Sequence, residues 1–243
     1  MAFFMLVLAP IALSVGDRLI SRAYAVSWWE ARNDSSGQAP DPAAVSEAVV
    51  QVYAARTYGW RGAFGVHTWF AVKPAGADRY ERLEVIGWGV SRGRPAVQIG
   101  SHRAADGYWF GSRPDLLADL RGKDAEAVIE AIYAAAARYP YPDSYRVWPG
   151  PNSNTFTAFV AREVPALALD LPPNAVGKDF LPNGDFVADA PSGTGIQVSL
   201  FGLLGFLVGS EEGVELNVLG LTIGVDVLQP ALKLPGIGRI GSN

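Results

Sequence analysis

The motif at residues 152–156 reads NSNTF, follows the turn WPGP and places a hydroxyl where a helix is predicted to begin, over 155–163. The positive end of a helix favours an anion or an oxyanion beside it, so Ser153 is a candidate nucleophile. Asn152 and Asn154 flank it as candidate supporting or ligand-contact residues. A plainer interpretation has equal standing: the residues from Asn152 to Thr155 only cap the helix, because all four are favoured N-cap types.

A serine nucleophile needs a base, and the sequence holds two histidines. His67 lies in a segment, 63–73, that is rich in β-branched and aromatic residues and is predicted to be a strand. His102 lies in a glycine-containing loop and is expected to be exposed. His67 and Ser153 are therefore the candidate catalytic pair, with Ser153 Oγ and a ring nitrogen of His67 expected within about 5 Å. The alternative for His67 is an ordinary core histidine.

The residue that would orient His67 is harder to choose. Glu84 lies on the next predicted strand, but the expected register puts His67 opposite Gly87. Glu84 would then lie roughly 10 Å away at about 3.3 Å per residue, beyond reach without a bulge. Gln98, on the following strand, is an equal candidate, and Gly87 and Gly89 could instead clear space for a ligand.

Composition excludes several classes of function. The absence of cysteine excludes disulfides, thiol catalysis and cysteine zinc sites, and two histidines argue against a multi-histidine metal site. No phosphate-binding loop, HExxH motif or calcium loop is present, so we predict no cofactor and no metal. The net charge of −4 without a basic run argues against nucleic-acid binding. With 49% hydrophobic and 18% charged residues, the chain can build a sizeable core.

The N-terminal segment 2–15 has no charged residue but is shorter than the roughly 20 apolar residues of a spanning helix. We expect it to be a membrane anchor or an uncleaved signal, and we expect the protein to partition with membranes. The alternative is a buried N-terminal helix. The orientation relative to the membrane is not fixed, because the arginines that follow argue only mildly for a cytoplasmic side.

The middle of the chain predicts an α+β fold, with antiparallel strands followed by helices. A polar link spans 33–44. Strands are predicted over 48–54, 63–73, 82–90 and 95–99, and helices over 114–120, 124–138 and 155–163.

The tail alternates apolar and polar residues, as strands do. The apolar positions are even-numbered from Ile196 to Leu200 and from Val214 to Val218, and odd-numbered from Leu219 onward. Such a change of parity indicates a bulge or a sharp bend. We predict a glycine-rich β-hairpin extension whose apolar face suits a lipid or protein contact, ending in a loose terminus after residue 232.

Several segments resemble an uncharacterised bacterial family, domain of unknown function 3750. They read VYAARTYGWRGAFGVHTWFAVK, WFGSRPDLLADLRG and RYPYPDSYRVWPGPNSNTF, and the glycine-rich tail follows them. The resemblance covers most of the chain from about residue 49 to 241. It implies a membrane-associated bacterial protein without an assigned activity.

The order of the candidate residues is more distantly similar to circularly permuted papain-like hydrolases, the NlpC-type peptidases and the relatives of lecithin:retinol acyltransferase. In those proteins a histidine strand comes first and a cysteine opens a later helix. Here Ser153 stands where the cysteine belongs, and a serine hydroxyl is far less acidic than a thiol. The likeness implies a permuted papain-like core over 48–190, between an anchor (1–24) with its linker (25–47) and the hairpin extension (191–243).

Two functions of different class follow. The first is an envelope hydrolase or acyltransferase at the bacterial inner membrane that acts on an amide or ester of peptidoglycan or lipid. The second is a catalytically inert, membrane-tethered protein that binds a ligand or an envelope protein. The sequence does not choose between them.

Overall fold

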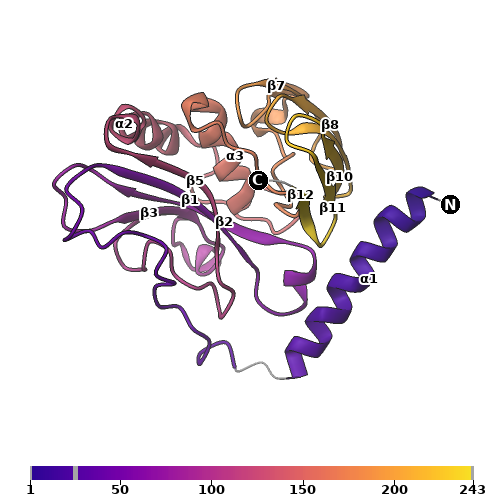
Figure 1. The fold of residues 1–243 in the computed structure, drawn as a ribbon, viewed down its shortest axis with the longest axis horizontal. Coiled ribbons are helices and arrows are strands. Elements are labelled where there is room, and N and C mark those ends of the chain that lie inside the picture. The colour runs from indigo at the N-terminus through magenta and orange to yellow at the C-terminus, as the bar shows by residue number, and fades with distance from the viewer. Residues whose placement is uncertain (1, 24–26, 242–243) are drawn as a thin grey trace.

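The computed structural model describes residues 2–23 and 27–241, and Figure 1 shows two antiparallel sheets with helices between and beside them. The first sheet has the strand order β4-β3-β2-β1-β5. Its strands are β1 (Val49–Arg56), β2 (Val66–Lys73), β3 (Glu81–Val85), β4 (Val97–Gly100) and β5 (Asp115–Arg121). The helices are α1 (Ala2–Ala23), α2 (Gly122–Arg138) and α3 (Ser153–Glu163), with short 3₁₀ turns η1 (Gly59–Ala63), η2 (Val90–Arg92), η3 (Pro165–Leu167) and η4 (Pro182–Gly184).

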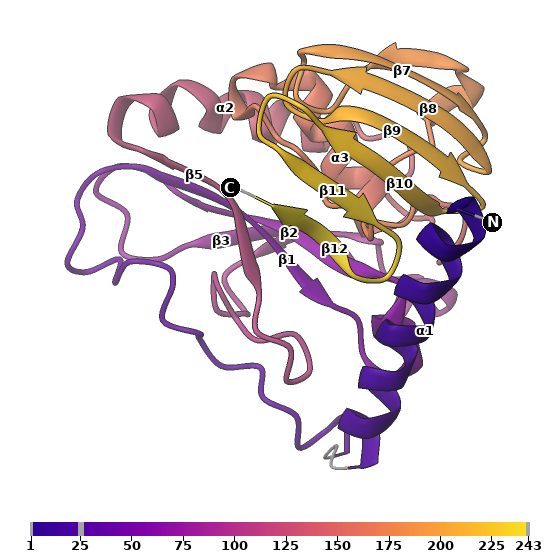
Figure 2. The same ribbon diagram turned by 45° about the vertical axis from the view of Figure 1, so that its right-hand side comes forward.

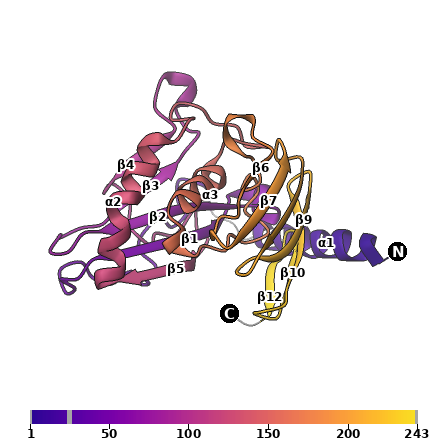
Figure 3. The same ribbon diagram turned by 90° about the horizontal axis from the view of Figure 1, so that it is seen from above.

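Helices α2 and α3 cover one face of the five-stranded sheet (Figures 1 and 3). The predicted apolar stripe of α2 packs inward, with Val128, Ile129, Ile132 and Ala136 buried in the main core. Phe156 of α3 joins the same core. The helices predicted over 124–138 and 155–163 are therefore confirmed, each beginning two residues earlier than expected.

Strand β5 corrects the helix predicted over 114–120. The segment DLLADLR contains good helix formers, but it pairs with the free edge of β1. Its pairing shifts register between Val52 and Tyr53, which marks a bulge. Edge pairing satisfies a row of β1 backbone groups that would otherwise stay open, so tertiary context overrides local propensity.

The second sheet corrects the predicted hairpin extension, because the tail forms seven strands in the order β12-β11-β10-β9-β8-β7-β6. Figure 2 shows most of them side by side. The strands are β6 (Val187–Asp189), β7 (Gly195–Leu200), β8 (Leu204–Gly209), β9 (Gly213–Val218), β10 (Leu221–Asp226), β11 (Ala231–Leu234) and β12 (Gly238–Gly241). The terminus predicted to be loose supplies β11 and β12, which close one side of the sheet.

The face of the seven-stranded sheet that packs on the rest of the molecule is polar. Glu215 binds Lys178 at 2.5 Å and Lys233 at 2.7 Å, and Lys233 also binds Asp170 at 2.7 Å. Burial alone would lower the pKa of Lys178, but the charge of Glu215 raises it. Opposite charges therefore hold this interior together, where the other sheet uses apolar packing.

The opposite face of the seven-stranded sheet is apolar and open to solvent. Its middle cross-strand row is Ile223, Leu216, Phe206, Val198 and Val187. Four of these side chains are between 39% and 61% exposed, and Ile223 is half-buried. The rows on either side are equally apolar, except for Asp189 at the β6 edge. The alternating residues of the tail thus form strands, but their polar side faces inward.

The change of parity at Leu219 is a two-residue turn between β9 and β10, where Val218 pairs with Leu221. Leu219 and Gly220 have φ angles of 56° and 85°, the left-handed values that a tight hairpin turn requires. This is the sharp bend that the parity change predicted.

Helix α1 contains the segment 2–15 and lies against η1, β10 and β11. Ser14 is buried in this contact and its hydroxyl donates to the carbonyls of Ala63 and Gly236. Met5, Leu6 and Leu8 remain exposed. Among the helices of residues 2–23 and 27–241, none reaches the combination of length and apolarity needed to cross a bilayer.

The chain is therefore α+β with an N-terminal helix and C-terminal strands, as expected at the level of fold class. The predicted polar link is partly fixed to the five-stranded unit. Asp106 accepts hydrogen bonds from Ser35, Ser36 and the backbone of Gln38. Ala39 of the link packs against the cluster that contains Tyr53 and Trp69, so the link lies on the sheet face that α2 and α3 leave uncovered.

Candidate functional site

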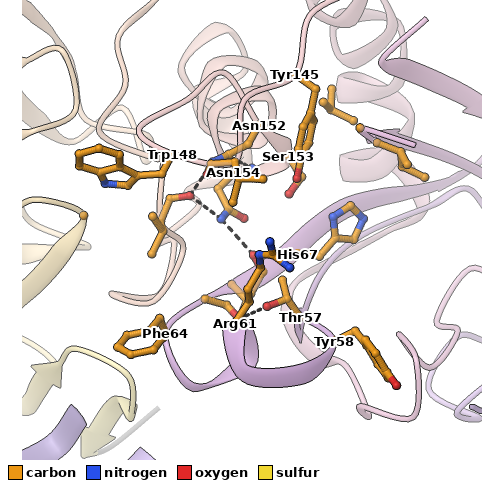
Figure 4. Close-up of a pocket in the computed structure, with 18 of the residues that line it drawn as sticks. Thr57, Tyr58, Arg61, Phe64, His67, Tyr145, Trp148, Asn152, Ser153 and Asn154 are labelled. Atoms are coloured by element: carbon orange, nitrogen blue, oxygen red, sulfur yellow. Dashed lines mark hydrogen bonds between the residues drawn. The ribbon is translucent and has the colours of Figure 1, made fainter. Parts of the chain in front are cut away.

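A pocket of about 670 Å³ lies where β2 and β3 separate. The two strands pair only from Phe70–Leu83 to Val72–Glu81, so the first residues of β2 have no partner on that side. The pocket is lined by Ser153 and His67 together with many aromatic side chains: Tyr58, Trp60, Phe64, Trp88, Trp109, Tyr145 and Trp148. Both predicted catalytic residues therefore line one cavity (Figure 4). They reach it from opposite faces of the sheet, because Thr68 of β2 bonds to α3, whereas the adjacent His67 stacks on Trp109.

Both parts of the molecule form the pocket wall. Leu219, Gly220 and Leu221 of the seven-stranded sheet line it opposite the five-stranded unit. The Trp148 indole Nε1 donates to the Leu219 carbonyl at 3.0 Å, which fixes the turn against the loop before α3.

His67 is held by Glu84, because its Nε2 lies 2.8 Å from Glu84 Oε2. The expected separation of roughly 10 Å is wrong because the register differs by one residue: Val72, not Lys73, pairs with Glu81. A shift of one residue moves every side chain to the other face of a sheet. Glu84 therefore shares a face with His67 and lies within reach.

Glu84 is a buried carboxylate surrounded by cations. Arg82 Nη2 donates to its Oε2 at 2.7 Å, and Arg103 Nε lies 3.6 Å from Oε1, too far for a hydrogen bond. Burial alone would raise the pKa of Glu84, but the hydrogen bond from His67 and the charge of Arg82 lower it to about 2. Glu84 is thus ionised at neutral pH.

The ring of His67 is neutral and fixed in orientation. Burial lowers its pKa, and the hydrogen bond to Glu84 offsets this only in part. The ring stacks on Trp109 with centroids 3.8 Å apart and planes 14° apart, and Trp88 continues the stack. Because ionised Glu84 only accepts, Nε2 carries the proton and Nδ1 is left as an acceptor. Within the described residues, Nδ1 has no hydrogen-bond partner.

Asn152, not Ser153, is the N-cap of α3. Its Oδ1 accepts from the backbone N–H groups of Asn154 and Thr155 at 2.9 and 3.1 Å, and its Nδ2 donates to the carbonyls of Val147 and Val176. Those two helix N–H groups are therefore used by the cap and are closed to an oxyanion.

The side chain of Asn154 is also hydrogen-bonded to other residues of the protein. Its Nδ2 donates to the carbonyls of Val66 and Val176, and its Oδ1 accepts from the Thr68 hydroxyl at 3.0 Å. The two asparagines thus support the site by joining the helix start to β2 and to residue 176. Their side-chain hydrogen bonds all go to the protein itself.

Ser153 lies at the first helical position, between the two asparagines. Its backbone carbonyl accepts from Thr68 at 3.3 Å, but its hydroxyl makes no hydrogen bond within the described residues. The motif therefore anchors its asparagines and leaves the serine hydroxyl free in a pocket wall.

Tyr145 and Arg61 are two of the pocket residues that the sequence analysis does not predict. Burial raises the pKa of Tyr145, so its phenol is neutral, and Figure 4 shows its side chain reaching into the pocket from the loop before α3. Arg61 of η1 adds a cation to the wall. Tyr145 also corrects the idea that Gly87 clears space for a ligand, because a Cβ at Gly87 would collide with the Tyr145 ring.

The remaining candidates lie outside this arrangement. Gln98 pairs with Glu84 across the sheet, but its side chain makes no hydrogen bond within the described part of the chain. A Cβ at Gly89 would meet the side chain of Arg94, so Gly89 makes room for the protein itself. His102 is exposed, as expected.

A family model described as "Protein of unknown function (DUF3750)" matches residues 47–180, which include His67, Glu84 and Ser153. The predicted family is thereby confirmed, whereas the papain-like likeness stays a prediction. Neither the curated proteins nor the solved structures contain a match.

Proposed function

We propose that this chain, which belongs to the DUF3750 family, is a serine hydrolase or acyltransferase that acts on an ester or an amide. The observation that carries the proposal is the hydrogen bond between His67 Nε2 and the ionised Glu84, in the pocket that also holds the unbonded hydroxyl of Ser153. A nucleophile, a base and a carboxylate that orients the base are the elements of a catalytic triad.

Each residue has a defined task in the proposed reaction. His67 Nδ1 takes the proton of Ser153 as Oγ attacks the carbonyl carbon, which requires the two atoms to approach about 3 Å. Glu84 stabilises the imidazolium that forms. The neutral Tyr145 phenol donates to the developing oxyanion in place of the occupied helix N–H groups. His67 then passes its proton to the leaving group, and water or a second acceptor takes the acyl group from Ser153.

The proposal keeps the expected location at the bacterial inner membrane. It is supported by the uncharged segment 2–15 and by the exposed Met5, Leu6 and Leu8 of α1. A substrate in peptidoglycan or lipid fits that location.

A second function is favoured by the stack of His67 on Trp109 and by the contacts of Glu84 with Arg82 and Arg103. The same contacts would hold a rigid aromatic wall in a protein that only binds. In that case the pocket takes a flat or apolar ligand, and Ser153 contributes no chemistry.

The experiment that separates the two functions replaces Ser153 by cysteine. The natural chain has no cysteine, so alkylation by iodoacetamide reports on the introduced thiol alone. If Nδ1 of His67 faces residue 153, the thiol should have a lowered pKa and react at least about tenfold faster at neutral pH than an isolated thiol. Ser144→Cys, at an exposed position of the loop before α3, provides that reference.

Adding His67→Ala or Glu84→Gln to Ser153→Cys should remove the advantage. Because Asn152 holds the cap, Ser153→Ala should leave the fold intact, and it serves as a control for labelling of the wild-type serine by a fluorophosphonate. An accessible Cys at 153 that reacts no faster than the reference would reject catalysis and favour the binding protein.

A further inference from the structure

The apolar outer face of the seven-stranded sheet is a large surface without a partner in the described chain. Its middle row crosses five strands without a polar side chain. The inward face of the same sheet carries buried Gln197, Glu215, Asn217 and Lys233. The sheet therefore buries its polar face and exposes its apolar face. An antiparallel sheet with one face in water usually has the opposite arrangement.

The turns at one end of this sheet carry large apolar residues in a conformation that disfavours them. Phe201 and Leu219 have φ angles of 53° and 56°, and their side chains are 48% and 59% exposed. Asn, Asp and Gly are the usual residues at such positions. Both turns therefore carry an apolar side chain at a conformational cost, and both side chains are about half exposed.

Helix α1 lies at the same end of the sheet, where it contacts β10 and β11. Figures 1 and 3 show its N-terminal end extending beyond the seven-stranded sheet on the side away from α3. Met5 and Leu8 are exposed there, and the first charge of the chain comes only at Asp17. The apolar part of α1 thus extends the apolar side of the sheet.

We propose that this outer face, together with the Phe201 and Leu219 tips, docks on the surface of a lipid bilayer. A protein partner would need about one hydrogen bond per 100–200 Å² of interface, and the middle row offers no side chain for one. Acyl chains require none. The proposal rests on the membrane association proposed above and not on the chemistry of Ser153.

The position of the pocket gives this docking a consequence for the substrate. Leu221 of the outer face and Leu219 of the adjacent tip also line the pocket of Ser153 and His67. Docking would bring the pocket mouth to the headgroup region. The substrate class is then an amphiphile with its acyl chain in the bilayer.

The test is flotation of the full-length protein with vesicles of phosphatidylethanolamine and phosphatidylglycerol. Phe206→Asp puts a charge on the middle row, and Ile99→Asp on β4 is the matched control, since the two side chains are 48% and 46% exposed. Phe201→Asn removes one tip while supplying a residue that the turn prefers, so folding is retained. Phe206→Asp should bind vesicles about tenfold more weakly than wild type and Phe201→Asn should also bind more weakly, whereas Ile99→Asp should bind normally.

Three results would overturn the docking face. One is equal binding by Phe206→Asp and Ile99→Asp. Another is loss of binding in Leu8→Asp alone, which would leave α1 as the membrane contact. The third is a wild-type dimer in solution that ignores vesicles and is dissociated by Phe206→Asp, which would assign the face to a second copy. Fluorophosphonate labelling of Ser153 without vesicles reports separately on the proposed chemistry.

Discussion

The two sheets of this protein bury opposite kinds of side chain. The five-stranded sheet packs apolar residues such as Phe70 and Leu83 against α2 and α3. The seven-stranded sheet packs Glu215 and Lys233 against the segment that follows α3. Alternation along a strand therefore identifies its two faces, but the surroundings decide which face is inside.

The largest expected effect tests the charged interior. Glu215→Gln leaves Lys178 and Lys233 buried without their shared carboxylate, which should cost about 3–5 kcal/mol of unfolding free energy. Urea unfolding measures this, with the exposed Asp185→Asn as control. A loss below about 1 kcal/mol would mean that the seven-stranded sheet does not depend on its ion pairs.

A smaller effect concerns pH. Burial raises the pKa of Asp170 to about 6 despite its contact with Lys233, so the folded state binds this proton more tightly than the unfolded chain. The stabilisation is complete below about pH 4 and is lost as the pH rises through about 6. Relative to Asp170→Asn, wild type should lose about 2–3 kcal/mol across that window. Parallel stability curves for the two proteins would refute this.

The pKa of Glu84 is shifted in the opposite direction, so its contribution to stability has the opposite pH dependence. Its pKa of about 2 lies below the ordinary value, so its contribution is present above about pH 4.5 and is lost as the pH falls toward 2. When unfolding free energy is measured against pH, the Glu84 contribution is therefore lost toward low pH and the Asp170 contribution is lost toward neutral pH.

The smallest expected effect is that of Leu216→Ala, which is compared with Leu83→Ala on the other sheet. Leu83→Ala should cost about 2–5 kcal/mol because its side chain is fully buried. Leu216→Ala should change stability by no more than about 0.5 kcal/mol in the absence of lipid, because that side chain is 39% exposed. Thermal melts of both variants suffice, and equal losses would contradict the exposed outer face.

The sequence predicted those elements whose local pattern and packing agree. The stripe of α2 and the start of α3 have both, so these helices were found. Strand β5 was mistaken for a helix because its pairing with β1 lies far along the chain and leaves no local signal. The seven-stranded sheet was underestimated because glycines conceal the strand pattern, and its buried charges look like a solvated face until their partners are known.

Contacts between distant segments also limited what the sequence could predict about the candidate site. His67 and Ser153 could be named from residue type and predicted element, but their partners depended on register. One residue of error moved Glu84 from a neighbour of His67 to the wrong side of the sheet. Tyr145 gave no signal at all, because its place in the pocket comes from a loop that folds back over Gly87.

The hydrogen bond from Trp148 to Leu219 also bears on how such a protein can diverge. The indole holds a backbone carbonyl, so the turn stays in place whichever side chain residue 219 carries. That side chain lines the pocket from outside the segment 47–180 that the family model matches. A substitution at residue 219 can therefore alter what the pocket admits without any change to His67, Glu84 or Ser153.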